Sequence, residues 1–149
     1  MALLQISEPG QSTAPHHHQL ACGIDLGTTN SLVASVMSGQ VTLFTDNNNE
    51  AMMPSVVHYG QGKKPIVGYD ACHYATTDPV NTIMSVKRFM GLSFKEVSEL
   101  KNCPYRLLES GNNVLFQTAM GDLSAVEISA SILSALKHRA ESALGGDLV

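Results

Sequence analysis

The sequence predicts a mixed-sheet α/β or α+β fold, and two observations support this. Short runs of strand-forming residues, separated by turn residues, fill the chain from Leu20 to Tyr69. Further short helices and a hairpin follow, and the last of these elements is an amphipathic helix that follows a capping signature. The chain has 149 residues, of which 44% are hydrophobic and 15% charged, a balance typical of one globular domain with its own core.

The first strands are predicted to form an antiparallel meander. LACGIDL is expected to be a buried strand, GTTN a turn, and SLVASVM the second strand. Ser38-Gly39 then turns the chain into VTLFT. Two short turns between three apolar runs leave no room for a crossover helix, so neighbouring strands should be antiparallel.

The middle of the chain mixes short strands with helical turns. DNNNEAMMPS is expected to be a polar loop that closes at Pro54, followed by the strands VVHYG and PIVGY on either side of a GQGKKP turn. Residues 70–77 predict one or two helical turns that end at Asp78-Pro79. Helical spacing of apolar residues predicts one helix over Asn81–Met90, ending at Gly91, and another over Ser93–Lys101.

The C-terminal part predicts a hairpin and then the long helix. YRLLES and VLFQTA flank the turn GNN. Ser124-x-x-Glu127 is a capping-box pattern, and the helix it begins is expected to end at Gly145-Gly146. The apolar stripe on this helix is expected to pack into the core, and its members are Ile128, Ile132, Leu133 and Leu136.

Residues 1–19 are predicted to be a flexible extension in front of a domain over 20–149. They contain Pro9, Gly10 and Pro15 and show no sustained period. They also lack the basic start and long apolar centre of a secretory signal, and no run of the chain is long enough to cross a membrane, which favours a cytoplasmic protein. The net charge of -4 and the scattered lysines and arginines give no reason to expect nucleic-acid binding.

The cysteines and histidines predict no metal framework. The three cysteines are widely spaced and form no Cys-x-x-Cys pair, so reduced thiols are the simple interpretation. A zinc site would have to recruit histidines from distant segments, and no two candidate ligands have a finger-like spacing.

The turn within GIDLGTTN carries the groups that a magnesium nucleotide needs. Asp25 at a strand end can attract a hydrated Mg²⁺, and Gly27 lets the backbone bend around a bulky anion. Thr28 and Thr29 supply hydroxyl and N–H donors, and Asn30 adds an amide. An ordinary hairpin turn remains the alternative, since the same residues are common turn formers. Walker-type and Rossmann glycine motifs are absent from the sequence.

GIDLGTTNSLVA resembles the first phosphate motif of the seventy-kilodalton heat-shock chaperones, the DnaK-like family. The resemblance continues, in the family's order, through PSVVHY, VGYDA, NTIMSVKRFMG and VEISASILSALK. Within the family, the lead MALLQISEPG and the apolar pair in Met52-Met53-Pro54 resemble the bacterial branch that serves iron–sulfur-cluster assembly. The resemblance implies an actin-like, ribonuclease-H-like ATPase fold, truncated to part of its first lobe as a mixed sheet with helices.

The resemblance also implies the site residues and the cofactors ATP or ADP and Mg. Asp25 would hold Mg through water, and the β- and γ-phosphates would be lined by Gly27, Thr28, Thr29 and Asn30. Lys87 matches the family's catalytic lysine, and Arg88 would lie near the nucleotide with a supporting role. Without the resemblance, Lys87-Arg88 on an amphipathic helix would be interpreted as a solvated face.

The implied function is that of an ATP-dependent chaperone in the maturation of iron–sulfur proteins. A J-domain co-chaperone would stimulate ATP hydrolysis, and an iron–sulfur scaffold protein would be the client, bound by a domain outside this chain. The chain alone would be an N-terminal fragment, inactive by itself and prone to self-association through exposed sheet edges. Alternatives are a general protein-folding chaperone of the DnaK type, a sugar kinase of the same fold, and a non-catalytic actin-like module.

Overall fold

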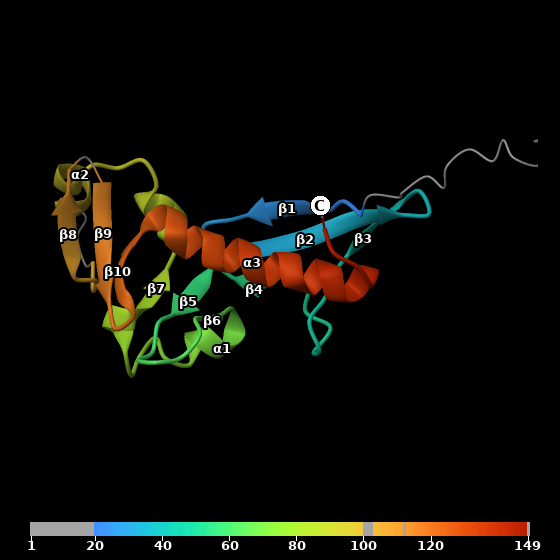
Figure 1. Ribbon diagram of the computed structural model, residues 1–149, viewed down its shortest axis with the longest axis horizontal. Coiled ribbons are helices and arrows are strands. Elements are labelled where there is room, and N and C mark those ends of the chain that lie inside the picture. The colour runs from blue at the N-terminus through green and yellow to red at the C-terminus, as the bar shows by residue number, and fades with distance from the viewer. Residues whose placement is uncertain (1–19, 100–102, 112, 149) are drawn as a thin grey trace, which may run out of the picture.

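The computed structural model describes residues 20–99, 103–111 and 113–148, and it consists of three small sheets joined by one long helix (Figure 1). The extension predicted over residues 1–19 lies outside the described residues. The strands are β1 (Gly23–Leu26), β2 (Asn30–Met37), β3 (Gln40–Leu43), β4 (Met53–Pro54), β5 (Val56–His58), β6 (Ile66–Val67), β7 (Thr82–Met84), β8 (Leu107–Ser110), β9 (Asn113–Thr118) and β10 (Gly121–Ser124). The helices are α1 (Tyr69–Cys72), α2 (Phe94–Ser98) and α3 (Ala125–Leu144), with the 3-10 turns η1 (Pro79–Asn81) and η2 (Val86–Phe89).

The first sheet confirms the predicted meander. Strands β1, β2 and β3 are antiparallel neighbours in that order. The turn between β2 and β3 places Ser38 and Gly39 at positive φ, 51° and 79°, as the tight Ser-Gly connection requires. The short strand β4 also pairs with β2, inside the segment expected to be a polar loop. Strand β4 could not be predicted, because it has only two residues and one of them is a proline, which is rare in strands.

The second sheet has β5 at its centre, between β6 and β7. The helix predicted over Asn81–Met90 is wrong, because this segment forms β7, then a left-handed residue, Ser85, and then η2. Ile83 and the β-branched Thr82 pair with β5, and this tertiary pairing overrides the helical spacing. The spacing was informative about burial, however, because Ile83, Val86 and Phe89 all lie in the core.

The third sheet, β8–β9–β10, contains the predicted hairpin and one strand that was not predicted. The short helix expected from Ser93 is confirmed as α2, and the residues predicted at its end, 100–102, lie outside the described part of the chain. A capping box fixes its start, because the Ser93 side chain accepts from the Glu96 N–H while the Glu96 carboxylate accepts from Ser93.

Helix α3 begins and ends where its signals predict. Ser124 and Glu127 form the capping box, and Gly145 ends the helix at φ 71°. The predicted stripe is confirmed for Ile128, Ile132 and Leu136, each 0% exposed, but it is wrong for Leu133, which is 37% exposed. A helix turns by about 100° per residue, so Leu133 points away from the face that its neighbour Ile132 buries.

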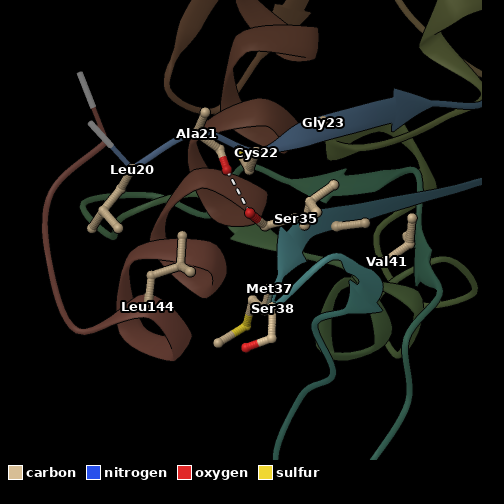
Figure 2. Close-up of a pocket in the computed structure, with 11 residues that line it drawn as sticks. Leu20, Ala21, Cys22, Gly23, Ser35, Met37, Ser38, Val41 and Leu144 are labelled. Carbon is tan, nitrogen blue, oxygen red and sulfur yellow. Dashed lines mark hydrogen bonds between the residues drawn. The ribbon is translucent and has the colours of Figure 1, made fainter. Parts of the chain in front are cut away.

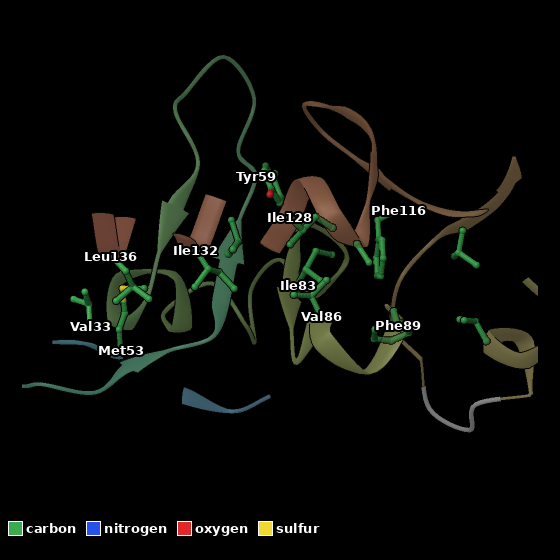
Figure 3. Packing of buried hydrophobic residues seen from close by; sticks show 14 of the residues in the cluster. Val33, Met53, Tyr59, Ile83, Val86, Phe89, Phe116, Ile128, Ile132 and Leu136 are labelled. Atoms are coloured by element: carbon green, nitrogen blue, oxygen red, sulfur yellow. The ribbon is translucent and has the colours of Figure 1, made fainter. Parts of the chain in front are cut away.

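The core follows α3 along its length. Figure 3 shows α3 side chains meeting Val33 and Met53 of the first sheet at one end, and Ile83, Val86 and Phe116 towards the other. The helix therefore joins three sheets into one core. On the opposite side of β2 and β3, the bare sheet face, the paired valines Val36 and Val41 are 68% and 76% exposed among the residues that the structure describes. No helix within the described ranges is long and apolar enough to cross a bilayer.

Candidate functional site

The turn between β1 and β2 is an open, exposed loop. Thr28, Thr29 and Asn30 are all exposed. The backbone N–H groups of Thr28 and Thr29 make no hydrogen bond to any described residue, so both are available to an outside acceptor. Successive free N–H groups in a tight turn form a concavity that suits an anion. The geometry therefore keeps the predicted phosphate-binding groups accessible.

Gly27 allows this turn to close. A Cβ atom built on Gly27 would lie 2.0 Å from the backbone oxygen of Asn30, which is far inside van der Waals contact. The obstacle is backbone, so no side-chain rotation can relieve it. This position therefore needs glycine because of a close approach within the turn itself.

Asp25 lies on β1 in an exposed position. The expectation of a wholly buried strand is wrong, since β1 alternates between exposed and half-buried residues. Asp25 is paired with Leu32, whereas the neighbouring Val33 is buried towards α3, so the carboxylate lies on the sheet face opposite the helix. It is free to face solvent beside the turn.

Lys87 is brought to the end of β1 by η2. Its Nζ donates a hydrogen bond to the backbone oxygen of Leu26, at 2.9 Å, although the two residues are 61 positions apart in sequence. The left-handed residue Ser85, at φ 54°, directs the chain into η2 just before this lysine. A positive charge thus lies next to the first residue of the turn. Arg88 follows on η2 and is exposed, and its side chain makes no hydrogen bond within the described residues.

Two buried serines support the turn from below, and the sequence analysis did not identify them. Ser31 and Ser55 are 1% and 2% exposed, and their hydroxyl oxygens lie 2.9 Å apart. The Ser31 Oγ accepts from the N–H of Gly27 at 3.2 Å, and the Ser55 Oγ donates to the Gly27 oxygen at 2.8 Å. A serine in an otherwise apolar strand context was the available signal, but its partner 24 residues away could not be read locally.

The donor set at the turn suits a magnesium ion that keeps its water shell. In the ranges that the structure describes, no group of three or more histidine, cysteine or acidic side chains could enclose a metal. Asp25 offers one exposed carboxylate. Mg²⁺ loses water reluctantly and is usually bound through one or two carboxylates together with substrate phosphates. One carboxylate beside a phosphate-binding turn fits that mode.

A hollow of about 730 Å³ lies at the other end of the first sheet (Figure 2). Its wall is mainly apolar, with Leu20, Met37, Val41 and Leu144 around it. The Ser35 hydroxyl in this wall is already used, because it donates to the Ala21 oxygen at 2.6 Å. A wall of this kind offers little to a phosphate, so the hollow is a different place from the candidate site.

An open turn with free N–H groups, together with an exposed carboxylate on β1 and a lysine held at the end of β1, is the arrangement expected of a nucleotide-binding domain. The chain belongs to the Hsp70 protein family, whose model matches residues 21–149. The fold class is thereby confirmed as part of the Hsp70 nucleotide-binding domain, with its actin-like ATPase fold.

Three curated relatives similar to this chain carry the name chaperone protein HscA homolog. The protein from Vibrio parahaemolyticus is 56% identical over 99% of this chain, and the one from Methylobacillus flagellatus is 54% identical over 99%. The homolog from a Janthinobacterium species is 53% identical over the whole chain. In each case the match covers 24% of the relative, so this chain spans about a quarter of the length of these proteins.

Proposed function

We propose that residues 20–149 are the N-terminal part of the ATPase domain of an Hsp70 chaperone, preceded by the extension 1–19, and that the turn Gly27–Asn30 holds the phosphates of ATP or ADP with Mg. The observation that carries this proposal is the 2.9 Å hydrogen bond from the Lys87 Nζ to the Leu26 oxygen. It joins the turn, which the chemistry of its residues indicates as a phosphate site, to the lysine that the family resemblance indicates as catalytic.

Each site residue has a role that its placement supports. The free N–H groups and hydroxyls of Thr28 and Thr29 would hold phosphate oxygens, with the Asn30 amide beside them. Gly27 lets the backbone close around the anion. Asp25 would hold Mg through water, and bound Mg would offset the negative charge of the phosphates.

Lys87 would stabilise the charge that develops on the phosphoryl group in transfer. An ammonium group has three N–H donors, so Lys87 can keep its bond to the Leu26 oxygen and still direct a second donor at a phosphate. The backbone contact then acts as a tether that fixes the position of the charge. Arg88, exposed on the same 3-10 turn, would add positive potential near the nucleotide.

The exposure of the turn indicates that this chain supports nucleotide binding better than ATP hydrolysis. Hydrolysis of ATP needs a site that excludes bulk water, and the turn is open to solvent. An opposing wall must close over it before catalysis becomes efficient. We therefore expect the chain by itself to bind phosphate more readily than it turns over ATP.

For the whole protein, we propose an ATP-driven chaperone of iron–sulfur-protein maturation. The support is the identity of 53–56% to proteins named HscA homologs, together with the resemblance of MALLQISEPG and Met52-Met53-Pro54 to that branch. A J-domain co-chaperone and an iron–sulfur scaffold protein are the partners that this proposal names. Cytoplasmic location belongs to the same proposal.

The test is calorimetric titration of Mg-ATP into the folded chain, with Asp25→Ala and Lys87→Ala alongside. Lys64→Ala is the matched control, because it removes one exposed positive charge from a loop far from the turn in sequence. We expect binding that weakens in both site variants and is unchanged in the control. Absence of heat from wild-type chain shown to be folded by circular dichroism would refute nucleotide binding by this turn. Equal weakening in Lys64→Ala would refute the specific role of Lys87.

A further inference from the structure

The buried serines Ser31 and Ser55 form a closed hydrogen-bond ring with Gly27. The ring has three links: the Gly27 N–H to the Ser31 Oγ at 3.2 Å, the two hydroxyls to each other at 2.9 Å, and the Ser55 Oγ to the Gly27 oxygen at 2.8 Å. Both polar groups of one peptide residue are therefore held by the same pair of side chains.

The direction of every proton in this ring follows from counting donors. Each hydroxyl has one proton. The Ser55 proton is used towards the Gly27 carbonyl, so the link between the hydroxyls must be donated by Ser31 to Ser55. The Ser31 oxygen is then free to accept from the Gly27 N–H. All donors in the ring point the same way round, an arrangement in which each bond strengthens the next.

Ser55 also joins the turn to the segment that carries Lys87, through its own backbone. Its N–H donates to the Thr29 oxygen at 2.8 Å, and its carbonyl accepts from the N–H of Ser85 at 3.3 Å. Ser85 precedes Lys87 by two residues and has the left-handed conformation that starts η2. Ser55 thus contacts the phosphate turn at Gly27 and Thr29, and it contacts the segment that carries Lys87 at Ser85.

We propose that Ser55, acting with Ser31, is the positioning residue of this site: it holds the turn at Gly27 and sets the turn's place relative to Lys87. Neither hydroxyl would touch nucleotide, because both are consumed by the ring and buried under the turn. The effect on nucleotide affinity rests on the function proposed above, whereas the effect on the turn itself does not.

The experiment uses Ser31→Ala, Ser55→Ala and the double variant, with Ser129→Ala as the control. Ser129 is also a buried serine, 3% exposed, and its hydroxyl donates to the Ala125 oxygen within α3 and also lies 3.6 Å from the Met90 sulfur, so it makes no contact with the phosphate turn. Amide hydrogen exchange at Gly27 and Ser85 is measured by NMR in the chain without ligand, and the Kd for Mg-ADP is measured by calorimetry. The free energy of unfolding of each variant is measured as well.

We expect either single variant to speed exchange at Gly27 by about tenfold and to raise the Kd by a similar factor, the equivalent of one hydrogen bond. Exchange at Ser85 should change little, because its acceptor is the backbone oxygen of Ser55, which alanine keeps. The double variant should change the exchange rate and the Kd by about as much as one single variant. The reason is that the loss of any one link already disrupts the whole ring. Ser129→Ala should leave exchange at both amides and the Kd unchanged, even if it costs as much stability.

Three results would overturn the proposal. Exchange at Gly27 that is unchanged in Ser55→Ala would show that the ring does not hold the turn. Losses that add fully in the double variant would show two independent contacts. If Ser129→Ala changes the exchange rates and the Kd as much as Ser55→Ala does, the two serines contribute only to general stability and do not position the turn. If wild-type chain binds no Mg-ADP, the proposed function fails, and the exchange data still decide whether the ring positions the turn.

Discussion

Replacing Gly27 with alanine probes the geometry of the turn with a single methyl group. The new Cβ would lie 2.0 Å from the Asn30 oxygen and 3.2 Å from the Asn30 carbonyl carbon, whereas ordinary contact begins at 3.4 Å. Both obstacles are backbone atoms, so the turn must widen. Widening would also pull the Gly27 N–H and oxygen away from Ser31 and Ser55. Overpacking typically costs about 1–3 kcal/mol and each of the two lost hydrogen bonds about 1 kcal/mol, so we expect a loss of about 3–5 kcal/mol.

Urea unfolding followed by far-ultraviolet circular dichroism measures this loss, with Gly23→Ala as the matched control. Gly23 lies on the same strand, and a Cβ built there meets nothing within 4 Å. The control should change stability by less than about 1 kcal/mol, and in the stabilising direction, because alanine restricts the unfolded chain more than glycine does. A Gly27→Ala chain within about 0.5 kcal/mol of wild type would refute the close approach described here.

Three further predictions concern α3 and the bare sheet face. Hydrogen bonds from the Ser124 N–H and hydroxyl lower the pKa of Glu127, so its stabilisation is present above the unfolded pKa of about 4.3 and is lost as pH falls through the lower folded value. Glu127→Gln should therefore flatten the loss of urea stability below about pH 4.3, and an unchanged profile would count against the capping box. Leu136→Ala should cost about 2–5 kcal/mol and the half-exposed Leu133→Ala under about 1 kcal/mol in the same assay, whereas equal losses would contradict the helix orientation. Val41→Lys should reduce self-association in light scattering, and a wild-type chain that is already monomeric would refute that prediction.

Features controlled by neighbouring residues could be predicted from the sequence. The Ser124 capping box, the left-handed stop at Gly145 and the Ser38-Gly39 turn all depend on groups within a few positions of one another, and the structure contains each of them. The composition of the turn likewise predicted accessible anion donors, and Thr28 and Thr29 have free N–H groups within the described chain.

Features that depend on distant partners could not be predicted from the residues. The segment from Asn81 reads as a helix because its apolar residues are three apart, yet β5 captures Thr82 and Ile83 as a strand. The same limit applies to the site residues. Lys87 was identified only through a family resemblance, since its partner lies 61 positions away. Ser55 was not identified at all, because its importance lies entirely in contacts with Gly27 and with Ser31, 24 positions earlier.

The position of α3 at the end of the described chain has a consequence for synthesis on the ribosome. Each sheet is built from strands close together in sequence, so its ladder can form as soon as those strands emerge. Among the described helices, α3 is the one that contacts all three sheets, through β2, β5 and β9, whereas α1 and α2 each contact part of them. A nascent chain that has not yet reached Ala125 therefore holds paired strands whose core residues, such as Val33 and Phe116, still face water. During that interval the chain presents the kind of surface that chaperones exist to shield.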